Sequence, residues 1–159
     1  QKGFFLGGVI TTSFLRTAKE SIRNYEKYES TKMKKKIFQA YDIRGRYPDE
    51  INTGAVAEIA VVLAKKFGKK KVVVGQDARL SSPMLSAAVI EALVLSRKSS
   101  KVVSLGLCTT PMFYFWCHKL KLPGIMVTAS HNPKDFNGLK VVGPSGEIIS
   151  GTEIKQWII

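Results

Sequence analysis

Apolar residues recur at helical spacing in three stretches of the chain from about residue 36 onward. The first predicted helix has Asn52 or Thr53 as its cap and is ended by Gly68. The second has Ser82 as its N-cap and Pro83 in its first turn, where proline is favoured. The third follows a pair of threonines that can cap it. The three helices are expected to cover residues 53–67, 83–95 and 111–119.

Short apolar runs lie between these helices and predict strands. The three valines at 72–74 are typical of a strand that is buried on both faces. We expect strands over residues 37–41, 71–75, 101–105, 124–127, 139–142 and 147–149, the last two being paired around a turn. Because helices separate most of the strands, the sequence predicts an α/β domain with three layers, α/β/α, and a mixed, mostly parallel sheet.

Three predicted loops follow strands and are expected to lie at one edge of the sheet, where ligands of such sheets bind. These loops are Gly75–Arg79, Gly106–Thr110 and Thr128–Asn137. In the first loop we favour a structural role, in which Asp77 and Arg79 hold neighbouring turns, over an anion site at the start of the following helix.

Residues 1–32 differ from the rest of the chain. They carry apolar residues at helical spacing, which predicts one amphipathic helix over about residues 14–29. Met33, three lysines and an apolar run then look like a natural start followed by the first strand. We therefore expect residues 1–35 to be an extension outside the fold and residues 36–159 to form the domain. The initial Gln1 favours a fragment or a processed chain.

The chain is strongly basic, with 25 Lys and Arg, 12 Asp and Glu, and a net charge of +13. Lysine clusters occur at 34–36 and 69–71, and no aromatic residues alternate with them as a groove for single-stranded nucleic acid requires. We favour solvated charge over a polyanion site at both clusters. No apolar run reaches membrane-spanning length. Neither nucleic acid nor a membrane is an expected partner.

Two cysteines, Cys108 and Cys117, lie nine residues apart and have no histidine at a metal-site spacing. This pattern favours neither a disulfide framework nor a zinc site. We expect both thiols to serve as small apolar residues. The expected location is the reducing cytoplasm.

The most informative residues are Ser130, His131, Asn132 and Pro133, which follow an apolar strand, and Lys140, which comes shortly after them. Adjacent residues of an extended chain point to opposite sides, so His131 is not obviously the base for Ser130. A serine that cycles between hydroxyl and phosphate needs cations and a metal rather than an acyl-transfer triad. The alternative is a turn after a strand, with His131 merely exposed.

Two cationic residues are candidate phosphate ligands. Arg44, beside Gly45 at the end of a predicted strand, can bind a phosphate through two parallel hydrogen bonds. A surface pair between Arg44 and Asp42 is an equal alternative. Lys140 can steady a phosphate near the serine, but taken alone it is better explained as a solvated lysine.

Four segments together resemble domain I of the α-D-phosphohexomutase superfamily, specifically of the phosphomannomutase/phosphoglucomutase family. They are residues 37–45, 75–83, 106–112 and 128–140. The resemblance covers about residues 36–153, and the sequence Thr128–Pro133 is its most specific motif. Tyr-Asp-Ile-Arg-Gly at 41–45 resembles the mannose/glucose branch rather than phosphoglucosamine mutase, which stays the alternative.

The resemblance implies an isomerase of the intramolecular phosphotransferase class. Ser130 would be a phosphoserine that gives its phosphoryl group to the 6-hydroxyl of a hexose 1-phosphate. The hexose 1,6-bisphosphate would turn over in the site, and its other phosphoryl group would return to Ser130. The implied cofactors are that bisphosphate and Mg²⁺, which Ser130 would bind through its phosphate.

The same resemblance implies roles for five neighbours of Ser130. Arg44, His131 and Lys140 are the other expected catalytic residues: the two cations suit electrostatic stabilisation, and His131 suits sugar-hydroxyl contact or proton transfer. Tyr41 and Asn132 are expected to bind substrate. The identity of the general base stays open.

Length is the chief departure from the family, whose enzymes have four domains. The expected partners are a phosphosugar and the missing downstream domains, and the chain alone is expected to be at most very weakly active. Two other hypotheses are a non-catalytic binding module with a basic tail and a folded fragment with no function of its own.

Overall fold

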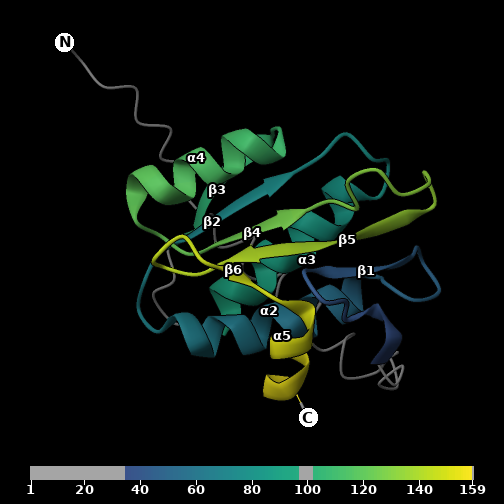
Figure 1. Cartoon of the computed structure of the whole chain (residues 1–159), viewed down its shortest axis with the longest axis horizontal. Helices are drawn as coiled ribbons and strands as arrows, with labels where there is room; N and C mark the ends of the chain where they lie inside the picture. The colour runs from purple at the N-terminus through teal and green to yellow at the C-terminus, as the bar shows by residue number, and fades with distance from the viewer. Residues whose placement is uncertain (1–34, 97–101, 159) are drawn as a thin grey trace. The chain divides into compact units, whose positions relative to one another are not determined.

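The computed structural model describes residues 35–96 and 102–158, and these residues lie within one compact unit (Figure 1). The extension predicted over residues 1–35, with its helix at 14–29, falls outside the described residues except for Lys35. Within the described ranges, no helix is long and apolar enough to cross a membrane.

A six-stranded sheet forms the centre of the domain, in the order β1-β5-β4-β2-β3, with β6 beside β5. The pairs β2–β3 and β2–β4 are parallel, and the pairs β1–β5, β4–β5 and β5–β6 are antiparallel. The predicted mixed α/β sheet is confirmed, although its parallel part is limited to three strands. The strands are β1 Ile43–Arg46, β2 Val72–Gln76, β3 Val102–Leu107, β4 Gly124–Val127, β5 Phe136–Val142 and β6 Ile148–Ile149.

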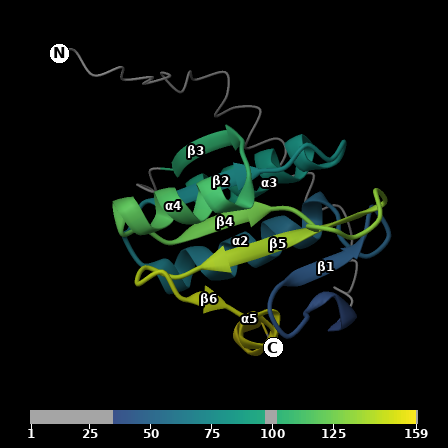
Figure 2. The same cartoon turned by 45° about the horizontal axis from the view of Figure 1, so that its top comes forward.

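Helices cover both faces of the sheet, which confirms the three layers (Figure 2). Val72 and Val74 of β2 pack in the larger core with α2, α3 and α5, whereas Val73 packs in the smaller core with α4. This alternation explains the continuous valine run, because successive side chains of a strand point to opposite faces. The helices are α2 Thr53–Phe67, α3 Ser82–Leu95, α4 Thr110–Leu120 and α5 Gly151–Ile158, preceded by the 3-10 helix η1 Lys35–Ile37.

The predicted strand at 37–41 is wrong. Residues 35–37 form η1, and Phe38 makes only an isolated bridge to Ile43, the first residue of β1. The chain reverses between them, since the Gln39 amide donates to the Asp42 carbonyl at 2.8 Å. Apolar pattern alone did not separate this tight turn from a strand.

Helix capping follows the sequence at two of the three predicted helices. Asn52 caps α2 and accepts from the Ala55 amide at 3.0 Å, and Thr109 caps α4. Ser82, expected as the cap of α3, is instead its first residue. The Ser82 hydroxyl donates to the Asp77 carboxylate at 2.5 Å, so it joins the helix to the loop after β2.

The two cysteines are free, buried members of the smaller core, which confirms the prediction that they act as small apolar residues. Burial, together with a smaller contribution from the nearby Cys108, raises the pKa of the Cys117 thiol to about 12. Since the reactive form is the thiolate, a higher pKa lowers the reactive fraction at neutral and mildly alkaline pH.

We therefore expect Cys117 in the folded chain to react with iodoacetamide at pH 8 at least about 100-fold more slowly than an unperturbed thiol with a pKa of about 8.5. Mass spectrometry of the labelled peptides measures both rates, and the urea-unfolded chain is the control in which Cys117 reacts normally. Equal rates in the folded and unfolded chain would contradict the buried position.

The smaller core is tightly packed around Gly75, the fourth residue of β2. A Cβ atom at this position would lie 2.7 Å from the Cys108 sulfur and 3.1 Å from the Met126 sulfur. Gly75→Ala is expected to lower the free energy of unfolding by about 1–3 kcal/mol through overpacking. Urea unfolding measures the change. Gly54→Ala in α2 is the matched control, because its Cβ meets no atom closer than 3.4 Å and alanine favours the helix.

Candidate functional site

The loops that follow β2, β3 and β4 lie together at one edge of the sheet, as the sequence predicted (Figure 1). The Asp77 amide donates to the Val127 carbonyl and the Cys108 amide to the Gln76 carbonyl, both at 3.0 Å. The third of these loops, residues 128–135, is called the serine loop below. Parallel strands place its Ser130 at the edge where ligands of α/β sheets bind.

Arg79 holds the serine loop through its backbone. Nη1 donates to the carbonyls of Pro133 at 2.6 Å and Phe136 at 2.9 Å, and Nη2 donates to those of Ser130 at 2.8 Å and Asn132 at 2.7 Å. Nε pairs with the Asp77 carboxylate at 3.2 Å. The structural role favoured for this loop is confirmed, and one guanidinium fixes most of the turn around Ser130.

Ser130 is exposed and has a left-handed backbone, with φ of 54°. Non-glycine residues rarely adopt this conformation, which costs on the order of 1 kcal/mol. It is maintained by local hydrogen bonds: the Ser130 amide donates to Thr128 Oγ1 at 2.9 Å, and the Asn132 amide donates to the Ala129 carbonyl at 3.1 Å. The loop thus presents a serine at a fixed, strained position on the surface.

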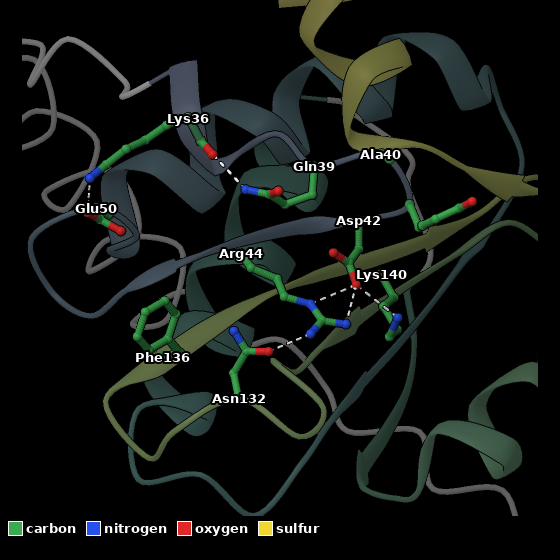
Figure 3. Close-up of a pocket in the computed structure, with 10 residues that line it drawn as sticks. Lys36, Gln39, Ala40, Asp42, Arg44, Glu50, Asn132, Phe136 and Lys140 are labelled. Carbon is green, nitrogen blue, oxygen red and sulfur yellow. Dashed lines mark hydrogen bonds and ion pairs between the residues drawn. The ribbon is translucent and has the colours of Figure 1, made fainter.

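Two cations meet beside the serine loop around the carboxylate of Asp42 (Figure 3). Asp42 Oδ2 accepts from Arg44 Nε at 2.8 Å, from Arg44 Nη2 at 2.7 Å and from Lys140 Nζ at 2.9 Å. Arg44 Nη1 donates to Asn132 Oδ1 at 2.5 Å and so reaches the serine loop. We call Asp42, Arg44, Asn132 and Lys140 the cation cluster.

The cluster follows from strand geometry. Asp42 and Arg44 are two residues apart and therefore share a face of the chain. The antiparallel register, in which Ile43 opposes Leu139, brings Lys140 opposite Asp42. The surface pair between Arg44 and Asp42, given above as an alternative, has the correct partner. It is not a surface pair, however, because the arginine side chain is only 18% exposed. Lys140, at 19%, is not a solvated lysine.

A cleft of about 720 Å³ opens over the cluster. Four of the six predicted site residues line it, namely Tyr41, Arg44, Asn132 and Lys140. Ser130 and His131 do not line the cleft and lie exposed in the adjoining serine loop. The other lining residues are Lys36, Gln39, Ala40, Asp42, Glu50 and Phe136.

The sequence did not indicate that Asp42 belongs to the site. It also did not indicate that Arg79 donates to the backbone carbonyls around Ser130. The alternation Asp42-Ile43-Arg44 was a signal that both charges share a face. The register that brings Lys140 to Asp42, and the turn that directs four carbonyls at Arg79, are tertiary features. Neither is encoded in a local pattern.

The residues that the structure describes do not form a Mg²⁺ site by themselves. Among residues 35–96 and 102–158, no group of three or more His, Cys, Asp and Glu side chains is placed to hold a metal. Asp42 already binds two cations. Mg²⁺ prefers six oxygen ligands, so a phosphate on Ser130 would fit as one ligand and most of the others would have to come from water or from other residues.

Comparison with known proteins gives one consistent picture. Residues 35–158 match the family "Phosphoglucomutase/phosphomannomutase, alpha/beta/alpha domain I". The chain is 46% identical over 114 residues to "Phosphohexose mutases" of Xanthomonas campestris pv. campestris (strain B100), which covers 71% of this chain and 25% of the relative. It is 38% identical over 115 residues to a phosphomannomutase of Klebsiella pneumoniae, covering 72% of each.

A solved structure agrees with these relatives. The chain superposes on a phosphoglucomutase/phosphomannomutase family protein of Burkholderia thailandensis with a TM-score of 0.68 and 33% identity. The similarity covers 79% of this chain and 29% of the other. The chain thus spans about a quarter of the length of the Xanthomonas relative and of this structure.

Proposed function

Because this chain belongs to the phosphoglucomutase/phosphomannomutase family, whose domain I it matches, we propose that it supplies the phosphoserine of a phosphohexomutase. The substrates are hexose 1-phosphates and hexose 6-phosphates of the glucose and mannose series. The observation that carries the proposal is the exposed, left-handed Ser130 next to a cleft that holds two cations.

In the proposed reaction, the 6-hydroxyl of a hexose 1-phosphate attacks the phosphorus and the P–O bond to Ser130 Oγ breaks. The proton lost by the 6-hydroxyl ends on Ser130 Oγ. The resulting 1,6-bisphosphate turns over in the cleft. Ser130 Oγ then attacks the phosphoryl group at the 1-position and gives up its proton, and the sugar oxygen that leaves takes up a proton. Atoms and protons balance over the cycle, and Ser130 ends phosphorylated as it began.

Arg44 and Lys140 stabilise the charge on the phosphoryl group during both transfers. Each phosphoryl transfer depends on precise positioning and on cations that neutralise the charge of the transferring group. Lys140 has three donor protons and Arg44 has five, so both retain donors beyond those given to Asp42 and Asn132. Tyr41 and Asn132, which line the cleft, bind the sugar phosphate. His131, which is exposed, contacts a sugar hydroxyl or transfers the proton of that hydroxyl.

Two further parts of the proposal concern the setting of the reaction. The phosphate on Ser130 would bind Mg²⁺, which when present neutralises charge on the phosphoryl group. The remaining ligands, the rest of the sugar site and the bisphosphate complex involve residues beyond those described.

We also propose a cytoplasmic location, which the two free, buried cysteines support.

A hybrid enzyme tests the proposed function. Residues 35–158 replace the matching quarter of the Xanthomonas relative, to which the chain is 46% identical. Conversion of glucose 1-phosphate to glucose 6-phosphate is followed with glucose-6-phosphate dehydrogenase, and the unaltered relative is the control. We expect turnover within about tenfold of the parent, a loss of less than about 1.4 kcal/mol in transition-state stabilisation. A hybrid with the parent's circular dichroism spectrum and melting temperature but without turnover would overturn the proposal.

A further inference from the structure

Asp42 has no role in the reaction described above, yet it occupies the centre of the cation cluster. Its side chain is only 6% exposed, and one of its oxygens, Oδ2, receives all three donors from Arg44 and Lys140. The two cations come from different strands, β1 and β5. A single buried oxygen therefore connects the two residues that are to contact the phosphoryl group.

The charges of the cluster explain why an acid is needed at this position. Arg44 and Lys140 are like charges, and like charges on neighbouring strands repel each other. The carboxylate between them offsets that repulsion and fixes the direction of the guanidinium, so that Arg44 Nη1 donates to the side-chain oxygen Oδ1 of Asn132 in the serine loop. Without Asp42, both long side chains would regain their rotamer freedom.

We propose that Asp42 is a positioning residue that holds Arg44 and Lys140 in one arrangement beside Ser130 before the phosphosugar binds. This inference rests on the proposed function. Donors that are already aligned need no reorganisation when charge develops on the phosphoryl group, and such preorganisation accelerates the reaction. With three donors on Oδ2, Asp42 acts through the two cations and not as the base.

The same charge has an opposite effect on binding. The Asp42 carboxylate lies close to the cations that attract the phosphosugar, so its negative charge weakens the ground-state binding of a phosphate dianion. Removing the charge is expected to slow turnover while leaving the KM unchanged or lowering it. A residue with a merely structural role would not separate kcat from KM in this direction.

The test uses the hybrid enzyme with Asp42→Asn, which keeps the shape of the side chain and removes its charge. We expect kcat to fall about 10- to 100-fold and the KM for glucose 1-phosphate to stay the same or fall. Asp49→Asn is the matched control, because this exposed acid does not line the cleft and the charge change is identical. An Asp42→Asn enzyme with the kcat of the control, or with a raised KM and unchanged kcat, would overturn the inference.

A second measurement does not depend on turnover. In the 159-residue chain, the Arg44 Nε–H group gives a side-chain NMR signal, identified by its loss in Arg44→Lys. We expect slowed solvent exchange of this proton in the native chain and in Asp49→Asn.

Should Asp42→Asn not fold, a second pair of variants tests the inference by turnover. Asp42→Glu, which keeps the charge, is expected to retain a higher kcat than Asp42→Ala. Rapid exchange in the native chain, or equal kcat in Glu and Ala variants, would overturn the inference.

The results separate the two proposals. An inactive but folded hybrid with Asp42 intact contradicts the phosphohexomutase function itself. An active hybrid in which Asp42→Asn matches Asp49→Asn leaves the function standing and removes only the positioning role.

Discussion

Replacing Ser130 by alanine in the hybrid enzyme is expected to lower kcat by at least about 10⁴-fold, since removal of a nucleophile has effects of this size in other enzymes. The variant loses the oxygen that is proposed to give and receive the phosphoryl group. The coupled conversion of glucose 1-phosphate measures the loss. The fold is expected to persist, because Ser130 is exposed.

Two comparisons separate the chemistry of Ser130 from its strained backbone. Ser130→Gly also removes the hydroxyl, but glycine adopts a φ of 54° without strain, so this variant is expected to be equally inactive and somewhat more stable than Ser130→Ala. Ser145→Ala, in the exposed turn between β5 and β6, is expected to keep full activity. Turnover by Ser130→Ala within tenfold of the hybrid would exclude Ser130 as the phosphoryl carrier.

The second large effect is expected for Arg79→Met. This change removes four hydrogen bonds, three to carbonyls of the serine loop and one to the carbonyl of Phe136, and leaves the carboxylate of Asp77 without its cation. We expect the free energy of unfolding to fall by about 3–4 kcal/mol, because a charged hydrogen-bonding partner is lost from a largely buried site. The kcat of the hybrid should fall about 100-fold, since small displacements of a reacting group are costly.

Arg46→Met is the matched control for Arg79→Met. Arg46 is also an arginine near the serine loop, but its side chain is 58% exposed and it pairs with Asp135 at 3.4 Å. Exposed ion pairs contribute about 0–1 kcal/mol, so this variant should unfold close to the native midpoint in urea and keep its turnover. Equal stability and equal kcat for the two arginine variants would contradict the role of Arg79 in holding the loop.

Local patterns predicted the helices and the central strands well. Helix caps such as Asn52 and Thr109 depend on interactions within a few residues. The burial of the strand at 72–74 can be predicted from its three consecutive valines. The strand expected at 37–41 failed for a different reason. The turn there is stabilised by contacts from far along the chain, including the Thr152 amide on the Gln39 carbonyl at 3.1 Å, and no local pattern contains that information.

The site shows the same division. The residue types of the serine loop and of the segment at 41–45 were sufficient to select the candidates, and four of them line one cleft. The grouping of Arg44 and Lys140 around Asp42 required the antiparallel β1–β5 register, which the expected mostly parallel sheet did not include. The hydrogen bonds from Arg79 to the backbone carbonyls around Ser130 depend on the conformation of a turn that contains a left-handed serine, and the sequence did not predict that conformation.

The central claim is that Ser130 carries the phosphoryl group. It is tested most directly by giving the hybrid enzyme glucose 1,6-bisphosphate labelled with ³²P in both phosphates and mapping the labelled peptide by mass spectrometry. We predict one phosphoryl group on Ser130, which unlabelled glucose 1-phosphate then removes as the enzyme turns over. Label on another residue, or an unlabelled Ser130 in an enzyme that turns over, would contradict it.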